Sequence, residues 1–352
     1  FAATNAPIAV RSSSLLEDSH YQPFAGVYAT YMIPFLEDKK EMLRMLACAI
    51  KAVYASVFYR DSKAYMLATS NVIDQEKMAV VLQQVVGKQY DGRFYPNISG
   101  VIRSINYYPV GNEKAEEGVA SLALGLGKHI VEGGQSIRLS PYHPNNVMQM
   151  SELHTALRQT QTDFYAIDTR HIGEDFKVDD GFNIMNLKVK DADADGALNF
   201  IASTYDPYDQ VIREGLYDGG RKIISFCGLL RQGVFPLPEL LKLSMRHGAD
   251  SMKRPVEIEF ACTLNNDRTG EFYLLQIRPI VDSKQMLDED LASIPDEKCL
   301  LRSHNSLGHG VSTDVTDVVY IKTSDDFTAA DNPAIAEEIE HMNRKFLADN
   351  TG

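Results

Sequence analysis

The segments Val256-Glu-Ile-Glu-Phe260 and Phe272-Tyr-Leu-Leu-Gln-Ile-Arg-Pro279 alternate in polarity on either side of Asn265-Asn-Asp-Arg-Thr-Gly270. Strict alternation places successive side chains on opposite faces of a strand, and Asn, Asp and Gly are typical of turns. The sequence therefore predicts an antiparallel hairpin over residues 256–280. One of its faces is expected to carry every second side chain of both strands, namely Glu257, Glu259, Leu274, Gln276 and Arg278.

This predicted face brings two carboxylates close to an amide and a guanidinium. Carboxylate and amide oxygens are hard ligands that suit Mg²⁺, which takes its remaining ligands from water and phosphates. The planar guanidinium of Arg278 matches phosphate oxygens. The alternative is an ordinary half-exposed hairpin whose polar side meets water, and the alternation by itself favours that alternative.

A second group of residues begins near the N-terminus of the chain. The short apolar strand Ile8-Ala-Val10 leads into Arg11-Ser-Ser-Ser14, with Glu17-Asp18 and Phe24-Ala-Gly26 further on. Small residues in a loop after a strand let backbone N–H groups approach an anion closely, and Arg11 adds a charged donor. The alternative is a strand end with a serine-rich turn.

Apolar spacing predicts amphipathic helices over about residues 37–59 and over Leu237–Gly248. The largely apolar run Met78–Val86 predicts a buried strand, and Gly100–Tyr108 contains a further strand candidate. We expect residues 117–134 to form a glycine-rich turn region.

The stretch from Pro141 to about Asp195 is polar, and we expect it to be irregular with short helical pieces such as Ser151–Arg158. Asp191-Ala-Asp-Ala-Asp-Gly196 resembles the start of a calcium loop, but Ala202 occupies the twelfth position, where such a loop needs Glu. We interpret the stretch as a solvated helix start with an Asp N-cap.

The organisation that follows is an α+β domain over residues 1–280, with approximate lobes 1–180 and 181–280. A polar, acidic linker is expected over residues 281–300. Residues 301–352 are expected to begin a small αβ segment, with a strand at Val318–Lys322 and a helix at Asn332–Leu347. His309 is interpreted as a loop histidine.

The composition excludes several classes of protein. The chain has 352 residues, 44% of them hydrophobic, and a formal net charge of -13, which disfavours nucleic acids and anionic membrane surfaces as partners. It contains no apolar run of 18 residues and no Cys-x-x-Cys pair among its four cysteines. We expect reduced thiols and a cytoplasmic location. Because the start lacks both Met and the features of a signal peptide, we also expect a piece of a longer polypeptide.

Taken together, the ordered motifs resemble the nucleotide domain of the phosphoenolpyruvate synthase and pyruvate phosphate dikinase family. The resemblance rests on matches in order along residues 8–280: Val10-Arg-Ser-Ser-Ser14 with Glu17-Asp18, Phe24-Ala-Gly26 and Thr30-Tyr31; Ile50–Phe58; Met78–Val86; Gly125-Leu-Gly127; and Glu257-Ile-Glu-Phe260 with Leu275-Gln-Ile-Arg-Pro279. It implies an ATP-grasp fold, with ATP between two α+β lobes. It also implies transfer of a phosphoryl group from ATP, through a phosphorylated histidine on a separate domain, to pyruvate.

The resemblance implies roles for the residues of this chain that match the family's motifs. The implied catalytic residues are Arg11, Gln276 and Arg278, and the implied Mg²⁺ ligands are Glu259, Gln276 and, more weakly, Glu257. The implied ATP contacts are Arg11, Ser12, Ser13, Gly26, Arg278 and the backbone of Gln83, Gln84, Val85 and Val86, with Arg60 as a second arginine whose register is off by one residue. The implied partners are ATP and the phosphohistidine and pyruvate-binding domains of the full-length protein.

The chain departs from the family at three points. A preceding Gly-Gly-Lys-like segment and a Thr-Ser-His-Ala-like motif are absent from the sequence, and Lys128 stands where the family usually has an acidic residue. The same ATP chemistry with another acceptor, as in antibiotic phosphotransferases and glucan dikinases, stays open. So do a nucleotide-sensing module without catalysis and a plain structural module.

Overall fold

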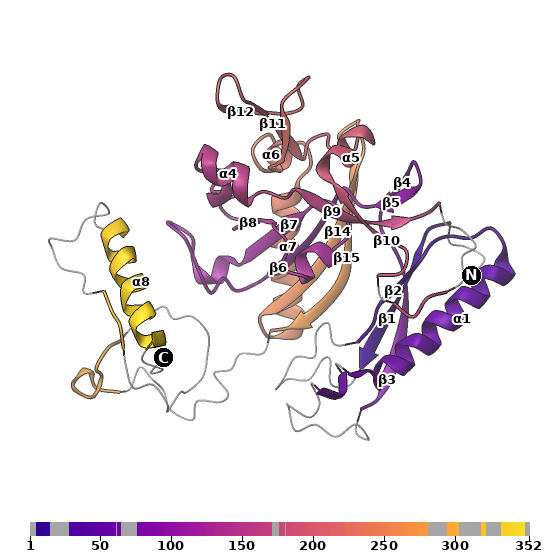
Figure 1. Cartoon of the computed structure of the whole chain (residues 1–352), viewed down its shortest axis with the longest axis horizontal. Coiled ribbons are helices and arrows are strands. Elements are labelled where there is room, and N and C mark those ends of the chain that lie inside the picture. Colours follow the sequence, from indigo (N-terminus) through magenta and orange to yellow (C-terminus); the bar gives the residue numbers. More distant parts are fainter. Residues whose placement is uncertain are drawn as a thin grey trace. The chain divides into compact units, whose positions relative to one another are not determined.

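The structure is a computed structural model, and it describes residues 5–14, 28–60, 62–64, 76–170, 176–179, 181–280, 294–302, 318–321 and 332–348. The chain divides into two compact units, Phe1–Val281 and Asp282–Gly352. In its described residues, the first unit contains four β-sheets and the helices that cover them, so it is a mixed α and β unit (Figure 1).

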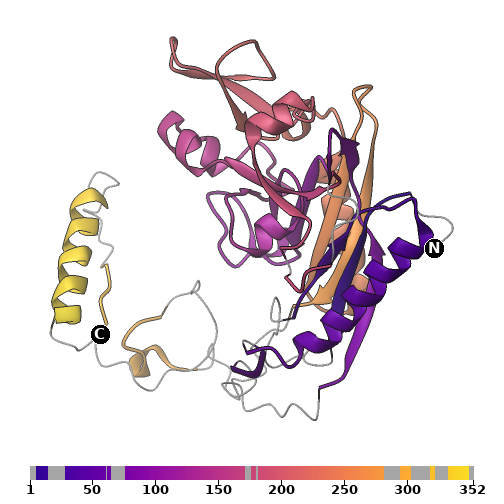
Figure 2. The same cartoon turned by 45° about the vertical axis from the view of Figure 1, so that its right-hand side comes forward.

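The N-terminal layer is a three-stranded sheet with the order β2-β1-β3. It consists of β1 (Ile8–Ser14), β2 (Tyr31–Ile33) and β3 (Met78–Gln84). Helix α1 (Lys39–Ser56) lies along one face of this sheet (Figure 2). The carboxylate of Asp38 caps the helix by accepting from the Lys40 N–H at 2.8 Å, which satisfies a donor at the first turn. The predicted helix over 37–59 is confirmed.

Apolar side chains hold α1 to the sheet. Its inner stripe repeats at three- and four-residue spacing and packs against the core side of β1 and β2. Burial of each large side chain stabilises the fold by about 2 kcal/mol. The residues in this cluster include Val10, Tyr31, Ile33, Met42, Met45, Leu46, Ala49 and Val53.

Two expectations for this layer are wrong. Arg11–Ser14 form no loop, because β1 continues to Ser14 and pairs with β3 along its whole length. Strand β3 is not buried, and Val81 and Leu82 are 44% and 43% exposed. The reason is that β3 is an edge strand, with a neighbour on one side only.

The central layer is a five-stranded antiparallel sheet with the order β15-β14-β6-β7-β8. Its strands are β6 (Ile98–Arg103), β7 (Val119–Ala123), β8 (Ile137–Leu139), β14 (Val256–Leu264) and β15 (Gly270–Pro279). Helix α7 (Leu237–Met252) packs against this sheet, and the helix predicted over Leu237–Gly248 is confirmed. Because the sheet joins strands from both sides of residue 180, the expected lobe boundary at that position does not divide the sheets.

The predicted hairpin is confirmed, with a β-bulge in its second strand. Glu257 lies opposite Arg278 and Glu259 opposite Gln276, and then Phe260 lies opposite Leu274. Leu275 is therefore the extra residue of the bulge. The bulge corrects one expectation, because it puts Leu274 in register with Phe260 and not on the face of Gln276.

A four-stranded sheet, β10-β9-β5-β4, lies in the same unit. Its strands are β4 (Lys88–Tyr90), β5 (Arg93–Tyr95), β9 (Asp163–Asp168) and β10 (Ile184–Lys188). The expectation that residues 141–195 are irregular is therefore wrong, although the short helix α4 (Leu153–Gln159) and the 3-10 turn Met148–Met150 do occur there. The sequence did not indicate these strands because β9 is short and only three of its residues, Phe164, Ala166 and Ile167, are buried and apolar.

The expected glycine-rich turn at 117–134 also contains regular elements. These are the 3-10 turn Ala115–Glu117, strand β7 and the short helix α3 (Lys128–Val131). A fourth sheet, β12-β11-β13, is built from β11 (Ala202–Asp206), β12 (Val211–Glu214) and β13 (Arg221–Ile224), and helix α6 (Cys227–Leu230) follows it.

The interpretation of Asp191–Gly196 as a solvated helix start is corrected. Helix α5 spans Val189–Ala194, and Asp191 lies in its first turn, where its carboxylate accepts from the Lys188 N–H at 2.9 Å. Asp195 is buried at the helix end, where it accepts from Tyr95 at 2.6 Å and pairs with Arg93 at 2.9 Å. These contacts tie α5 to β5, so the aspartates have a structural explanation.

The second unit contains a 3-10 turn at Asp296–Lys298 and helix α8 (Asn332–Ala348), which confirms the helix predicted there. Residues 318–321 form no strand, and Lys322 lies outside the described residues. The strand expected at Val318–Lys322 is thus wrong, because those four residues have no strand partner within the described ranges.

Within the described residues, no helix combines the length and apolar character needed to cross a membrane. All four cysteines are free thiols, as expected.

Gly100 provides a test of the close packing in the central sheet. A Cβ at this position of β6 would lie 2.3 Å from the Phe260 ring and 2.8 Å from the Ser121 carbonyl oxygen. We expect Gly100→Ala to lower the free energy of unfolding by about 2 kcal/mol through overpacking, measured by urea denaturation. Gly127→Ala is the control, because its Cβ would meet only Ser99 at 3.9 Å. Equal stability of the two variants would contradict this packing.

Candidate functional site

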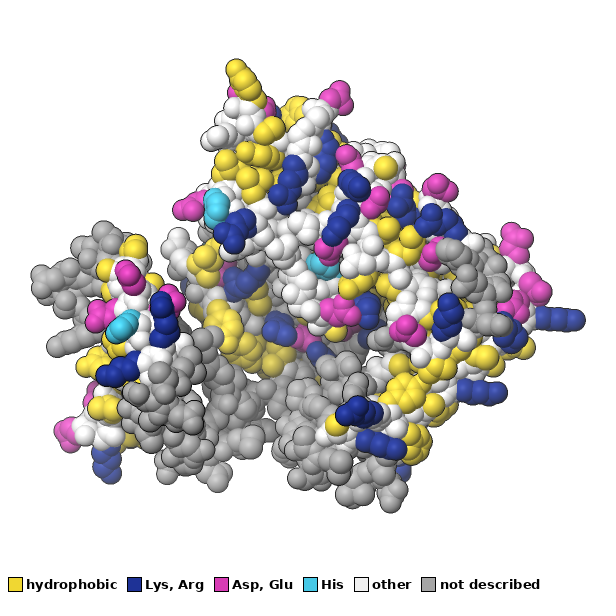
Figure 3. Space-filling view, viewed as in Figure 1, with side chains coloured by type: hydrophobic (Ala, Val, Ile, Leu, Met, Phe, Trp, Pro, Cys, Tyr) yellow, Lys and Arg dark blue, Asp and Glu magenta, His cyan; other side chains and the backbone are white. Residues whose placement is uncertain are grey.

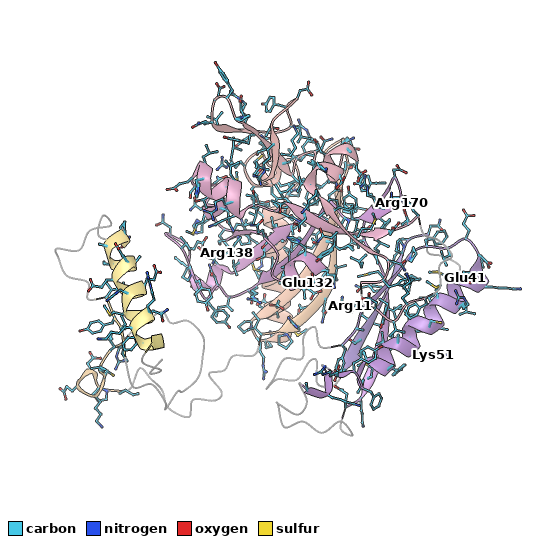
Figure 4. All side chains as sticks on the ribbon, in the orientation of Figure 1. Arg11, Glu41, Lys51, Glu132, Arg138 and Arg170 are labelled. Atoms are coloured by element: carbon cyan, nitrogen blue, oxygen red, sulfur yellow. The ribbon has the colours of Figure 1, made fainter. Side chains whose placement is uncertain are left out.

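Arg11 connects the N-terminal sheet to the hairpin of the central sheet. Its Nη2 donates to Gln276 Oε1 at 2.6 Å and lies 3.4 Å from Glu259 Oε2, while Nη1 donates to Gln83 Oε1 at 3.2 Å. Figure 4 labels Arg11, which extends from β1 toward β14 and β15. Arg11 and Glu259 are each a little more than a quarter exposed, so the contact lies at the surface of the junction.

The bulge in β15 completes this junction. Gln83 on β3 donates from Nε2 to the Leu275 carbonyl at 3.1 Å. Leu275 is the bulged residue, and a bulge leaves a residue outside the regular pairing of the ladder. The same glutamine therefore holds Arg11 through its oxygen and the hairpin through its nitrogen.

Glu257 forms a second charged group beside the first. It is only 7% exposed, and it accepts from Arg103 Nε at 2.6 Å and from Arg278 Nε at 2.7 Å, with a further bond from Arg278 Nη2. Burial alone favours the neutral carboxyl, but the charges and hydrogen bonds of Arg278 and Arg103 outweigh it and hold the pKa of Glu257 below its ordinary value of 4.5. Glu257 is therefore ionised at neutral pH.

The structure thus brings together Arg11, Glu257, Glu259, Gln276 and Arg278, all of which the sequence predicted, and adds the side chain of Gln83. Arg103 was missed. It lies on β6 opposite Glu257 in the ladder. The only signal in the sequence was an arginine in a candidate strand, and nothing local shows that β6 pairs with β14.

Most of the other residues implied as ATP contacts lie in β1, at the end of β3 or beyond α1. Ser12 lies one residue from Arg11 in β1, so its side chain is on the α1 side of the sheet, whereas Ser13 lies on the same side as Arg11. The Val85 N–H already donates to the Pro7 carbonyl at 2.8 Å, and Gln84 ends β3, with Val86 following. Arg60 is exposed beyond the end of α1. Gly26 lies outside the described residues.

The donor set would fit a Mg²⁺ ion that takes most of its ligands from phosphates and water. Glu259 and Gln276 present one carboxylate and one amide oxygen side by side, which matches the few protein ligands that Mg²⁺ takes when phosphates supply the rest. Glu257 fits less well, because both its oxygens accept from arginines. Within the described residues, no group of three or more His, Cys, Asp or Glu is arranged to hold a metal without such help.

The glycine motif at 125–127 leads into α3. Gly125 has a φ of 85°, a conformation that favours glycine, and the Leu126 N–H donates to the Tyr165 carbonyl at 2.9 Å. Lys128, where the resemblance implies an acidic residue, pairs with Glu132 at 2.8 Å, and Glu132 also accepts from the Tyr165 hydroxyl. The lysine thus has a local ion pair within α3.

A cavity of about 310 Å³ lies elsewhere in the unit, lined by residues of the fourth sheet and of α4 and α6, such as Leu153, Ile212 and Cys227. No residue of the Arg11 and Glu257 groups lines it. The one arginine in its lining, Arg231, is paired with Glu214, whereas the Arg11 and Glu257 groups bring together three arginines and therefore suit a polyanion better.

The surface charges do not form a general field that would attract anions. Acidic and basic side chains are mixed over the face seen in Figure 3, and the whole chain is acidic. Any phosphate must therefore be held by the local arginines of the site. The geometry defines the class of the molecule as a mixed α and β protein with a cluster of arginines, carboxylates and amides where two of its sheets meet.

Comparison with known proteins agrees with this class. A family model described as "Pyruvate phosphate dikinase, AMP/ATP-binding domain" matches residues 1–298. The chain therefore belongs to this family. It is also 32% identical over 126 residues to a protein of Bacillus subtilis (strain 168) described as "Uncharacterized phosphotransferase YvkC". That match covers 36% of this chain and 13% of the relative.

The buried carboxylate at 257 gives a test of the second charged group. Glu257→Gln leaves two arginines without their anion, so we expect a loss of about 3 kcal/mol in unfolding free energy at pH 7. Because the folded-state pKa is depressed, the contribution of Glu257 is present above pH 4.5 and is lost as the pH falls through the lower folded value. Urea denaturation from pH 7 to pH 3 should show the difference between wild type and variant shrinking below pH 4.5. A difference that grows as the pH falls would contradict this account.

Proposed function

We propose that this domain binds ATP in the manner of an ATP-grasp protein, with the phosphates between the β1–β3 sheet and the β14–β15 hairpin. The observation that carries the proposal is the contact of Arg11 with Gln276 and Glu259, since it gathers a phosphate-binding cation and two oxygen ligands from opposite sides of one junction. Membership of a family described as AMP/ATP-binding supports the choice of nucleotide.

Each residue then has a distinct task. Arg11 exchanges its amide and carboxylate partners for phosphate oxygens, with which a guanidinium forms charge-assisted and often bidentate hydrogen bonds. Glu259 and Gln276 would hold Mg²⁺, which supplies neutralising charge on the phosphate oxygens. Arg278 is kept in place by Glu257 and stabilises charge on the phosphoryl group during transfer.

We further propose that the phosphoryl group passes to a histidine on a separate domain of the full-length protein and from there to pyruvate. The family match and the printed description of the Bacillus relative as a phosphotransferase support transfer. Transfer of this kind needs positioned charges more than covalent help from the nucleotide domain. The second candidate is the same ATP chemistry with another acceptor, because the printed description of the Bacillus relative names a phosphotransferase without an acceptor.

The binding proposal is tested by titrating the purified chain with ATP in a calorimeter, with and without Mg²⁺. We expect micromolar binding that depends on Mg²⁺ and weakens at least tenfold in Gln276→Ala, because the variant loses an oxygen ligand and a partner of Arg11. Gln232→Ala is the control, since its side chain pairs with Glu214 outside the site.

Absence of ATP binding by the unaltered chain would contradict the proposal. Phosphoryl transfer to an added phosphohistidine domain separates an enzyme from a nucleotide sensor. A sensor binds ATP but leaves the histidine unmodified.

A further inference from the structure

Glu257 holds two arginines, and one of them has no part in the roles given above. Arg278 reaches it from β15 on one side and Arg103 from β6 on the other, because β14 lies between these strands. One buried carboxylate thus fixes two guanidinium groups on one face of the central sheet. The face is that of Glu259 and Gln276, since alternate residues of a strand share a face.

Both arginines have N–H donors that the contact with Glu257 does not use. Arg103 donates to Glu257 through Nε and its side chain is 52% exposed, and Arg278 uses Nε and Nη2 while it is 33% exposed. Within the described residues, the two Nη atoms of Arg103 and Nη1 of Arg278 have no hydrogen-bond partner. A guanidinium has five N–H donors in a rigid fork, so each group can hold Glu257 with one edge and an anion with another.

The balance of charge around Glu257 also favours an anionic ligand between the two arginines. Two guanidinium groups on one carboxylate leave a surplus positive charge in a chain whose net charge is -13. One arginine is enough to pair a buried glutamate, and a second, half-exposed ion pair adds little to stability. The second arginine is therefore better explained by a ligand than by folding alone.

We propose that Arg103 and Arg278 form a two-arginine clamp, oriented by Glu257, for a phosphate group of the nucleotide's polyphosphate tail. This inference rests on the proposed function and extends it by a residue that the motifs did not indicate. Arg103 then takes the part of the second phosphate-facing arginine. Arg60 does not, because it lies exposed after α1, outside the central sheet.

The test compares ATP with adenosine in calorimetric titrations of wild type, Arg103→Ala and Arg103→Lys in phosphate-free buffer with Mg²⁺. We expect Arg103→Ala to weaken ATP binding about tenfold and to leave adenosine binding unchanged, because adenosine has no phosphate to contact. Arg103→Lys should fall in between, since an ammonium keeps the charge but not the fork. A merely structural role would move both ligands together or neither.

The control is Arg213→Ala, which removes an exposed arginine from its pairs with Asp206 and Asp209 on a different sheet. Thermal unfolding of each variant checks the fold, and Arg103→Lys keeps the test valid if the alanine variant does not fold.

A last titration uses inorganic phosphate as the probe on the ATP-bound protein. In one outcome, Arg103→Ala loses phosphate binding while its ATP affinity is unchanged. This result would overturn the assignment to the nucleotide tail, because the clamp would then bind free phosphate. ATP and phosphate affinities equal to wild type in both Arg103 variants would overturn the clamp itself. If wild type binds no ATP, the proposed function fails, which is a different result from either.

Discussion

The register of β14 between its two neighbours is the constraint on which the site depends. It sets Glu257 against Arg278 on one side and Arg103 on the other, and it sets Glu259 against Gln276. A slip of one residue would turn both glutamates into the apolar layer under α7 and bring Ile258 and Phe260 to the surface. The apolar face therefore enforces the position of the polar one, so the same alternation that stabilises the sheet also assembles the charged groups.

The second requirement is that the N-terminal sheet meets this face. The contact is polar and small, since it consists of Arg11 and Gln83 on one side and Glu259, Gln276 and the Leu275 carbonyl on the other. Exposed polar contacts contribute little to stability and are exchanged easily for those of a ligand. A junction of this kind suits a site that must open for a nucleotide and close on it.

Much of the site could be predicted from the sequence, because it lies in strands with strict alternation. The pairing of Glu257 and Glu259 with Gln276 and Arg278 follows from one hairpin, whose two strands are adjacent in the chain. The bulge at Leu275 could not be predicted, since it depends on how β15 meets β3 and β14 together. Arg103 was also beyond reach, because its pairing joins residues more than 150 positions apart.

The same difference between local patterns and long-range pairing explains how much of the fold could be predicted. Long periodic elements such as α1 and α7 follow from their own apolar spacing. Strands β9 and β10 do not, since both are short and β9 also pairs with β5, which lies far from it in the sequence. Arg11 was expected in a phosphate loop but lies in a strand, so the role proposed for it rests on its side chain and not on a nest of backbone amides.

The most direct test of the account is a crystal structure of the protein with a non-hydrolysable ATP analogue and Mn²⁺, which can be located by its anomalous scattering. The account predicts the phosphates between β1 and the β14–β15 hairpin, with the metal about 2.2 Å from oxygens of Glu259 and Gln276 and with Arg11 turned to the phosphates. A nucleotide bound elsewhere, such as in the cavity beside Leu153 and Cys227, with Arg11 still on Gln276, would contradict it.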